Sequence, residues 1–243
     1  MLTGILAAAP ARTIDEVIAI MTAIDGALPD GDGLKWFNRL YLRVTVNVRD
    51  AVTGAAFNDP AFLAQLDVVF GNLYFDAATA AERNPDAAPP AWRPLFERRN
   101  QPHIARIQFA LAGMNAHINR DLPAGIVAAF DDEGGTPVAD SARRQDFDRV
   151  NTILEQVEAA VKAEFESQAL QEVDEASGRL DDTLAMWSVS AARAAAWTNA
   201  QILWTLRSLP PLREAFFDKL DRLTGFASRG LLIIPGEAVV GAG

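Results

Sequence analysis

The sequence predicts an all-α protein, a bundle of about seven helices. Apolar residues recur every three or four positions along most of the 243 residues, and strand-like alternation is confined to one short stretch. No alternation of strands with helices indicates a parallel sheet. Half of the residues are hydrophobic, which is enough for a sizeable core. We therefore expect a single helical domain over residues 1–243.

The helices of the N-terminal half begin with recognisable start signals. Thr13 followed by Glu16 is a capping box, and the apolar residues after it recur at helical spacing. In residues 34–53 three valines alternate with polar residues as in a strand, but a longer apolar stripe at helical spacing favours a helix. Pro60 suits the first turn of the next helix. The helices expected here cover residues 14–26, 34–53 and a segment from Asn58 through Tyr74.

Four further helices are expected, and the first of them, residues 102–121, is the most apolar. Pro123 lies just beyond its end, and we expect this segment to be the central helix of the bundle. The later helices are expected at residues 146–173, 180–207 and 212–229. Irregular loops or tails are expected at residues 27–33, 78–100, 131–145 and 230–243, several of which are rich in proline, glycine or acidic residues.

Composition excludes several classes of function. There are 22 Lys and Arg against 32 Asp and Glu, a net charge of −10, which argues against binding to nucleic acid or to an anionic membrane. The chain has no cysteine and two histidines, so thiolate chemistry and a three-histidine metal site are excluded. No apolar run is long enough to span a bilayer, and no basic secretory start is present. We expect a soluble, cytoplasmic protein.

His117 and Asp121, one helical turn apart, are the predicted catalytic pair. A carboxylate at this spacing can orient an imidazole and make it a usable general base or acid. Two alternatives stay open: the pair supplies ligands to a divalent metal with carboxylates from other helices, or Asp121 only satisfies a structural histidine. No cofactor is predicted. The other histidine, His103, is expected at a helix start as a surface or capping residue.

Polar side chains within apolar helices are the predicted substrate-binding groups. Buried amides need hydrogen-bond partners, and those of residues 102–121 are expected to converge with His117 on one interhelical cavity. Asp67 and its neighbours in a core-like helix are expected either to line that cavity or to bond one another. The predicted substrate-binding residues are Asn38, Arg39, Asn72, Gln108, Asn115, Asn119, Trp187 and Arg193.

Two of these assignments have a purely structural alternative. Arg39 lies in an aromatic run and can hold an anionic substituent, but it can equally pair with one of the many acids. Trp187 and Arg193 follow one strip of a helix that is rich in tryptophan. Large rings can wall a pocket or form ordinary core.

Three segments carry a resemblance to a known family. They are Trp36-Phe-Asn-Arg-Leu-Tyr41, the run from Leu66 to Phe75, and the long block from Gln108 to Pro123. The chain resembles the DUF5995 family of bacterial, largely actinobacterial, proteins, over about residues 13–207. The resemblance implies a soluble bacterial protein in which residues 103–123 matter. It implies no activity and no catalytic residue.

The sequence favours a protein that acts on or binds a small hydrophobic or amphipathic molecule in a mainly apolar pocket. Hydrolysis, isomerisation and cyclisation all fit acid–base chemistry by a His–Asp pair. A phosphate-binding glycine loop, a nucleophile elbow and a zinc-protease motif are all missing. The alternatives are a metal-dependent hydrolase or cyclase, and a non-catalytic helical scaffold or binding protein. A homo-oligomer through the amphipathic C-terminal helices is possible.

Overall fold

The computed structural model describes residues 2–54, 57–139, 141–169 and 188–233, with only the backbone for 157–169. This described part is helical and contains no strand, so the predicted all-α class is confirmed. Its helices are α1 (Thr3–Leu6), α2 (Ile14–Ala27), α3 (Gly33–Thr53), α4 (Pro60–Arg83), η1 (Pro85–Ala87), α5 (Arg93–Arg98), α6 (Arg106–Ala116), η2 (His117–Asp121), α7 (Leu122–Glu133), α8 (Ala142–Ala169), α10 (Val189–Thr205), η3 (Leu206–Ser208) and α11 (Pro210–Leu231).

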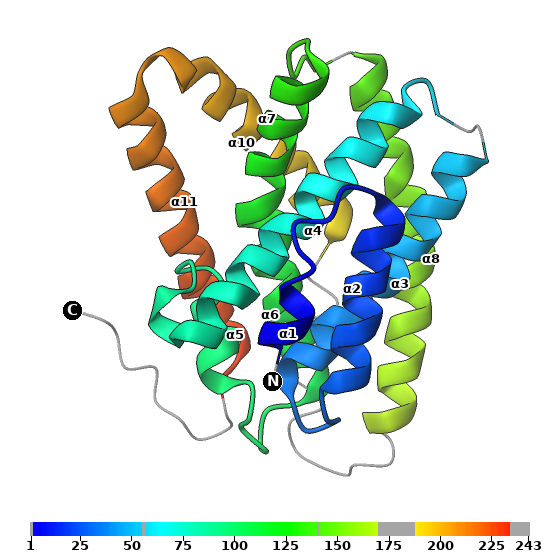
Figure 1. Cartoon of the computed structure of the whole chain (residues 1–243), viewed down its shortest axis with the longest axis vertical. Coiled ribbons are helices and arrows are strands. Elements are labelled where there is room, and N and C mark those ends of the chain that lie inside the picture. Colours follow the sequence, from blue (N-terminus) through cyan, green and yellow to red (C-terminus); the bar gives the residue numbers. More distant parts are fainter. Residues whose placement is uncertain (1, 55–56, 140, 170–187, 234–243) are drawn as a thin grey trace.

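A continuous helical path of α6, η2 and α7 runs through the middle of the molecule (Figure 1). Helices α3 and α11 pack against α6, whereas α4 and α10 pack against α7. Helix α2 lies against α3, and α8 contacts α3, α4 and α10. Helices α8 and α11 flank the path on opposite sides in Figure 1. The middle of the path is therefore surrounded by helices from all parts of the chain.

Capping side chains explain why the predicted N-terminal helices begin where they do. The Thr13 hydroxyl accepts a hydrogen bond from the backbone N–H of Glu16 at 3.1 Å, which confirms the capping signal at the start of α2. Asp32 accepts from the Leu34 N–H ahead of α3. The predicted helix over residues 34–53 is thereby confirmed, and its strand-like alternation is a local coincidence.

The central helix differs from its prediction at both ends. It begins at Arg106, so His103 lies in an exposed loop before it. It also does not stop at Pro123. The N–H of Leu122 bonds to the carbonyl of His117, five residues back, which gives a π-helical turn over His117–Asp121. This wider turn accommodates a proline, which has no N–H to donate, and the chain continues as α7.

The predicted loop over residues 78–100 is wrong in part. Helix α4 continues to Arg83, since an alanine-rich stretch favours helix until Asn84 ends it. Within the proline-rich connection, α5 forms with Pro94 in its first turn, where no backbone donor is needed.

The predicted loop over residues 131–145 is also too long. Helix α7 reaches Glu133 and is followed by Gly134 at φ 73°, a conformation that glycine adopts without strain. Helix α8 already begins at Ala142.

The C-terminal helices match their predictions within the described residues. Helix α8 corresponds to the prediction at 146–173, α10 to that at 180–207, and α11 to that at 212–229. Residues 170–187 and 234–243 lie outside the described residues. The end of the helix predicted at 146–173, the start of the helix predicted at 180–207 and most of the tail predicted at 230–243 fall there. The short helix α1 was not predicted.

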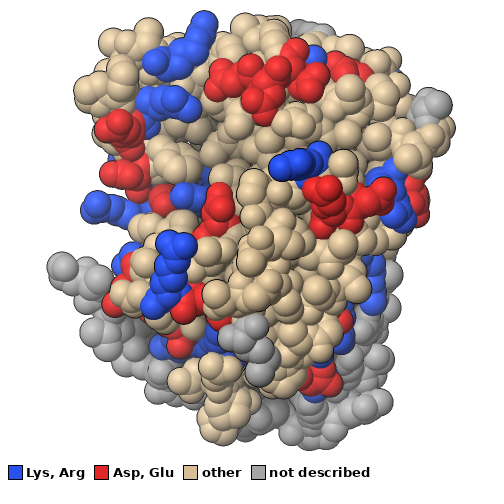
Figure 2. All heavy atoms as spheres, in the orientation of Figure 1, with Lys and Arg blue, Asp and Glu red and all other residues tan. Residues whose placement is uncertain are grey.

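The buried apolar side chains form one core, to which every described α-helix except α11 contributes residues. Leu232, which directly follows α11, also belongs to this core. Among the described helices, none has the length and apolar character to cross a bilayer. Acidic and basic side chains are interspersed on the face shown in Figure 2, without a broad basic area there.

Candidate functional site

A small cavity lies beside the π-helical turn, among α3, α4, α6, α8 and α10. Its volume is about 50 Å³, which is room for about three water molecules or a small organic group. Eleven of the fifteen lining residues are apolar, and the polar ones come from four different elements. The lining residues are Tyr41, Val44, Val48, Leu63, Leu66, Asp67, Phe70, Met114, His117, Ile118, Leu122, Val150, Leu154, Val189 and Arg193.

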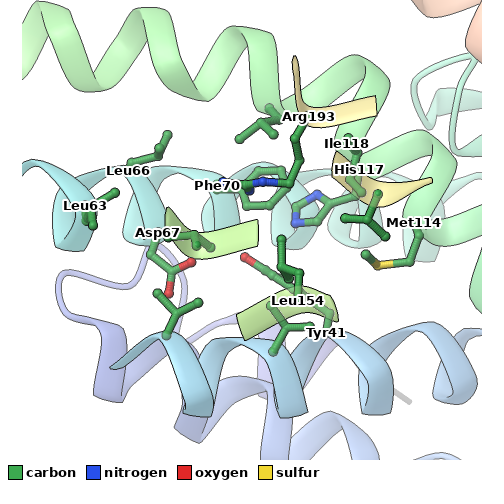
Figure 3. Close-up of a pocket in the computed structure, with 15 residues that line it drawn as sticks. Tyr41, Leu63, Leu66, Asp67, Phe70, Met114, His117, Ile118, Leu154 and Arg193 are labelled. Carbon is green, nitrogen blue, oxygen red and sulfur yellow. The ribbon is translucent and has the colours of Figure 1, made fainter. Parts of the chain in front are cut away.

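The imidazole of His117 is fully buried and held between aromatic rings (Figure 3). The ring of Phe70 stacks on it with a centroid distance of 3.4 Å and an interplanar angle of 7°. Tyr41 meets it at a steep angle, with centroids 4.4 Å apart. These contacts leave the imidazole little freedom to rotate, as a reacting group requires.

Asp121 fixes which nitrogen of His117 carries the proton. Its Oδ2 lies 3.0 Å from Nδ1 of His117 and accepts a hydrogen bond from the indole N–H of Trp92 at 2.8 Å. Its Oδ1 accepts from Arg120 at 2.6 Å. Because a carboxylate paired with arginine is an acceptor, Nδ1 must be the donor. Nε2 of His117 is then an acceptor, and it has no partner among the described residues.

Arg120 anchors this pair to the rest of the protein. Its Nε lies 3.3 Å from Asp221 of α11, and Asp221 accepts from the backbone N–H of Ala91 at 2.7 Å. The Asp121 carboxylate is therefore positioned by groups from the π turn, from the connection before α5 and from α11. Such support around a histidine–carboxylate pair is typical of sites in which the ring must keep one orientation.

Burial lowers the pKa of His117, and the hydrogen bond and negative charge of Asp121 oppose this effect only in part. The imidazole is consequently neutral at pH 7, with a free lone pair on Nε2. A neutral imidazole with its other nitrogen bonded to a carboxylate is the form that acts as a general base.

Asp67 and Tyr41 present two further unsatisfied groups to the cavity. Oδ2 of Asp67 has no hydrogen-bond partner among the described residues, and the Tyr41 hydroxyl has none with good geometry there, although the Thr45 hydroxyl one turn away interacts with it. In Figure 3 the Tyr41 hydroxyl points between Asp67 and His117. Burial raises the pKa of Asp67 to about 7, although Arg193 opposes the shift. Burial also raises the pKa of Tyr41 well above its usual value, and Asp67 adds to this, so the hydroxyl keeps its proton.

Unpaired buried polar atoms are uncommon, because each costs roughly 1–3 kcal/mol. Here three of them, on His117, Asp67 and Tyr41, belong to side chains that line the same cavity. The arrangement therefore combines a base, a group with a pKa near 7, and a hydroxyl donor, all facing a space that can receive a small molecule.

Most donor atoms around His117 that could bind a metal ion are engaged in hydrogen bonds. Within the part of the chain that the structure describes, no three histidine, aspartate or glutamate side chains gather as a ligand set. Nδ1 of His117 is bonded to Asp121, and both carboxylate oxygens already accept hydrogen bonds. A metal ion would have to replace these bonds, so the pair cannot chelate it in this arrangement.

The predicted amides of the central helix lie away from the cavity and bind α11 or its C-terminal end. Asn115 donates to the Thr224 carbonyl at 3.0 Å and to the Ser228 hydroxyl at 2.9 Å. Asn119 donates to the Asn115 oxygen, and Gln108 donates to the carbonyl of Leu231. The expectation that these amides converge with His117 is thus not met: they satisfy one another and neighbouring backbone.

Other predicted binding residues also have structural partners. Asn38 donates to the Met21 carbonyl, and Asn72 bonds both the N–H and the carbonyl of Ala11. Arg39 pairs with Asp25 at 3.2 Å. The structure therefore leaves these three side chains outside the cavity. Trp187 lies outside the described residues.

Arg193 and His117 are the predicted site residues that line the cavity, with Asp121 directly behind His117. Sequence reasoning did not select Tyr41 or Phe70 as site residues, and it left open whether Asp67 lines the cavity, as it does here. Asp67 gave a signal, as an acid inside an apolar helical run. Tyr41 and Phe70 gave none, because aromatic residues at helical spacing also describe ordinary core.

The fold and the cavity together define a class of protein: an all-helical bundle whose interior presents a carboxylate-oriented imidazole to a small, mainly apolar space. The family model of DUF5995, described as a family of unknown function, matches residues 14–233. The chain therefore belongs to the DUF5995 family, as its sequence resemblance indicated. Searches of the curated proteins and of the solved structures find no match.

Proposed function

We propose that this protein catalyses a proton transfer in a small, mainly apolar molecule bound in the cavity. His117 takes or returns the proton through Nε2, and Asp121 holds the ring in the required tautomer. One observation carries the proposal: His117 lines the cavity with Nδ1 bonded to Asp121, and its Nε2 has no partner among the described residues. This is the arrangement that a histidine general base requires.

Asp67 and Tyr41 supply the complementary roles. A carboxyl group with a pKa of about 7 holds a proton part of the time at neutral pH, and can donate it to a substrate oxygen. The protonated Tyr41 hydroxyl can hydrogen-bond to negative charge that develops on that oxygen. Because the cavity walls are mainly apolar, such interactions are stronger than they would be in water. Isomerisation, hydrolysis and cyclisation of a small substrate all contain a step of this kind.

The test uses a panel of small ketones, lactones and esters, each with and without a carboxylate group, with turnover and solvent deuterium incorporation followed by NMR. For any compound that is turned over, we expect His117→Gln to lower the rate by about 10²–10⁴-fold. Asp121→Asn should also lower it, since an amide does not hold the same tautomer.

His103→Gln is the matched control, because His103 is exposed and lies outside the cavity. It should leave the rate unchanged. Turnover that survives His117→Gln within about threefold would contradict the assignment of the general base.

A further inference from the structure

Arg193 is a buried cation at the cavity, and its hydrogen-bond partners among the described residues are neutral. Its Nε donates to the side-chain oxygen of Asn151 at 2.8 Å, and Nη2 donates to the carbonyl of Phe147 at 2.8 Å. The guanidinium lies 4.0 Å from the centre of the Phe147 ring. Among the described residues, no carboxylate lies within ion-pair distance of it. Buried arginines are normally paired, whereas among the described residues the carboxylates that act on Arg193, first Asp148 and then Asp67, do so without direct contact.

The charged and titratable groups around Arg193 in this part of the cavity come from four elements besides α10. Asp67 of α4, Tyr41 of α3 and His117 of η2 line it with Arg193. Helix α8 adds Arg144 and Asp148, which pair with each other at 2.8 Å. Asp67 is thus the acid that shares the cavity with Arg193, and its Oδ2 has no partner among the described residues.

Two states of Asp67 follow from this arrangement. When Asp67 is ionised, it partly balances the charge of Arg193 across the cavity. When Asp67 is protonated, Arg193 is left without that balance, and the carboxyl group becomes a hydrogen-bond donor. Because the pKa of Asp67 is raised to about 7 by burial, both states are populated near neutral pH. The protonated state presents one cation, a carboxyl donor and a hydroxyl donor to the same small space.

We propose that the cavity binds a small monocarboxylate with a short apolar chain, and that Asp67 takes up one proton from solvent when this anion enters. The ligand carboxylate becomes the counter-ion of Arg193 and accepts hydrogen bonds from Asp67 and Tyr41. One negative charge and one proton enter together, so the charge inside the cavity does not change. The inference rests on the proposed function, since it names the ligand class of the same cavity.

The size and lining of the cavity limit the ligand further. A volume of about 50 Å³ restricts it to a few heavy atoms, and the aliphatic walls favour an apolar chain. A neutral amide or alcohol would leave Arg193 without a counter-ion. A dianion would bury a second charge for which the lining offers no second cation among the described residues.

The experiment is calorimetric titration of the full chain with propionate and with its neutral isostere propionamide, between pH 5.5 and pH 8.5. At pH 6 we expect propionate to bind at least tenfold more tightly than propionamide. Because binding requires protonated Asp67, the Kd should be constant well below pH 7 and rise tenfold per pH unit well above it. Titrations in buffers of different ionisation enthalpy should show uptake that approaches one proton at pH 8.

Asp67→Asn keeps a hydrogen-bond donor but cannot take up a proton. It should bind propionate with a Kd that is independent of pH over this range, and with no proton uptake. Asp76→Asn is the matched control, because Asp76 lies on the same helix, also has a raised pKa, and does not line the cavity. It should behave as wild type.

The outcomes separate this inference from the proposed function. A pH-independent Kd in the wild type, or equal Kd values for propionate and propionamide, overturns the inference and leaves acid–base chemistry at His117 intact. If neither compound binds and neither changes the NMR signals of His117, the cavity is not a ligand site, and the proposed function is overturned as well.

Discussion

The carboxyl group of Asp67 should destabilise the folded protein above pH 7, and Asp67→Asn should relieve this. The pKa of Asp67 rises from 3.8 to about 7 on folding, a difference of about 3. One pKa unit corresponds to about 1.36 kcal/mol, so ionised Asp67 lowers the unfolding free energy by about 4 kcal/mol. Because the folded pKa is the higher one, the cost is absent below pH 3.8, grows between pH 3.8 and pH 7, and is complete above pH 7.

Urea unfolding at pH 4, 6 and 8, followed by tryptophan fluorescence, measures this cost. The difference in unfolding free energy between Asp67→Asn and wild type should rise by about 4 kcal/mol from pH 4 to pH 8. With a urea m-value of about 3 kcal/mol/M, this moves the midpoint by about 1 M. Asp76→Asn, on the exposed side of the same helix, should show a clearly smaller change. Parallel pH profiles for Asp67→Asn and wild type would refute the reasoning.

Two further predictions concern the packing around the site. Asn115→Ala should lower the unfolding free energy by about 1–3 kcal/mol, because it leaves buried hydrogen-bond partners on α11 unsatisfied. Asn47→Ala, on the surface, should change the unfolding free energy little. Thermal unfolding measures both variants, and equal effects would contradict the role given to Asn115. Gly113→Ala should destabilise by about 1–3 kcal/mol, because the new Cβ would lie 2.4–2.6 Å from atoms of Phe37. Near-UV circular dichroism should report the displaced ring, and an unchanged spectrum with unchanged stability would refute this contact.

Local signals predicted the starts of α2 and α4, because Thr13 and Pro60 lie at the helix start itself. Pro123 misled the prediction, since a proline usually ends a helix and nothing in the sequence shows that a π turn accommodates it. The helix–loop boundaries at 78–100 failed for a similar reason: Pro94 and its neighbours can start a helix as well as break one.

The geometry of the site was predictable only within the segment that carries His117 and Asp121, although Arg193 was also predicted as a binding residue. His117 and Asp121 share one helical segment, so their spacing revealed the pair. Tyr41 and Asp67 come from other helices, and only tertiary packing brings them to the same cavity. For Asn115 the sequence predicted burial correctly, but periodicity cannot show whether a buried amide faces a ligand or the backbone of another helix.

The protonation state of His117 tests the central claim most directly. The chain has two histidines, so the His103→Gln variant leaves one imidazole to observe by ¹⁵N NMR. The account predicts a proton on Nδ1, a bare Nε2, and a neutral ring from pH 8 to well below pH 6.5, because burial lowers the pKa. A proton on Nε2 at neutral pH, or a ring that becomes charged above pH 6.5, would contradict it.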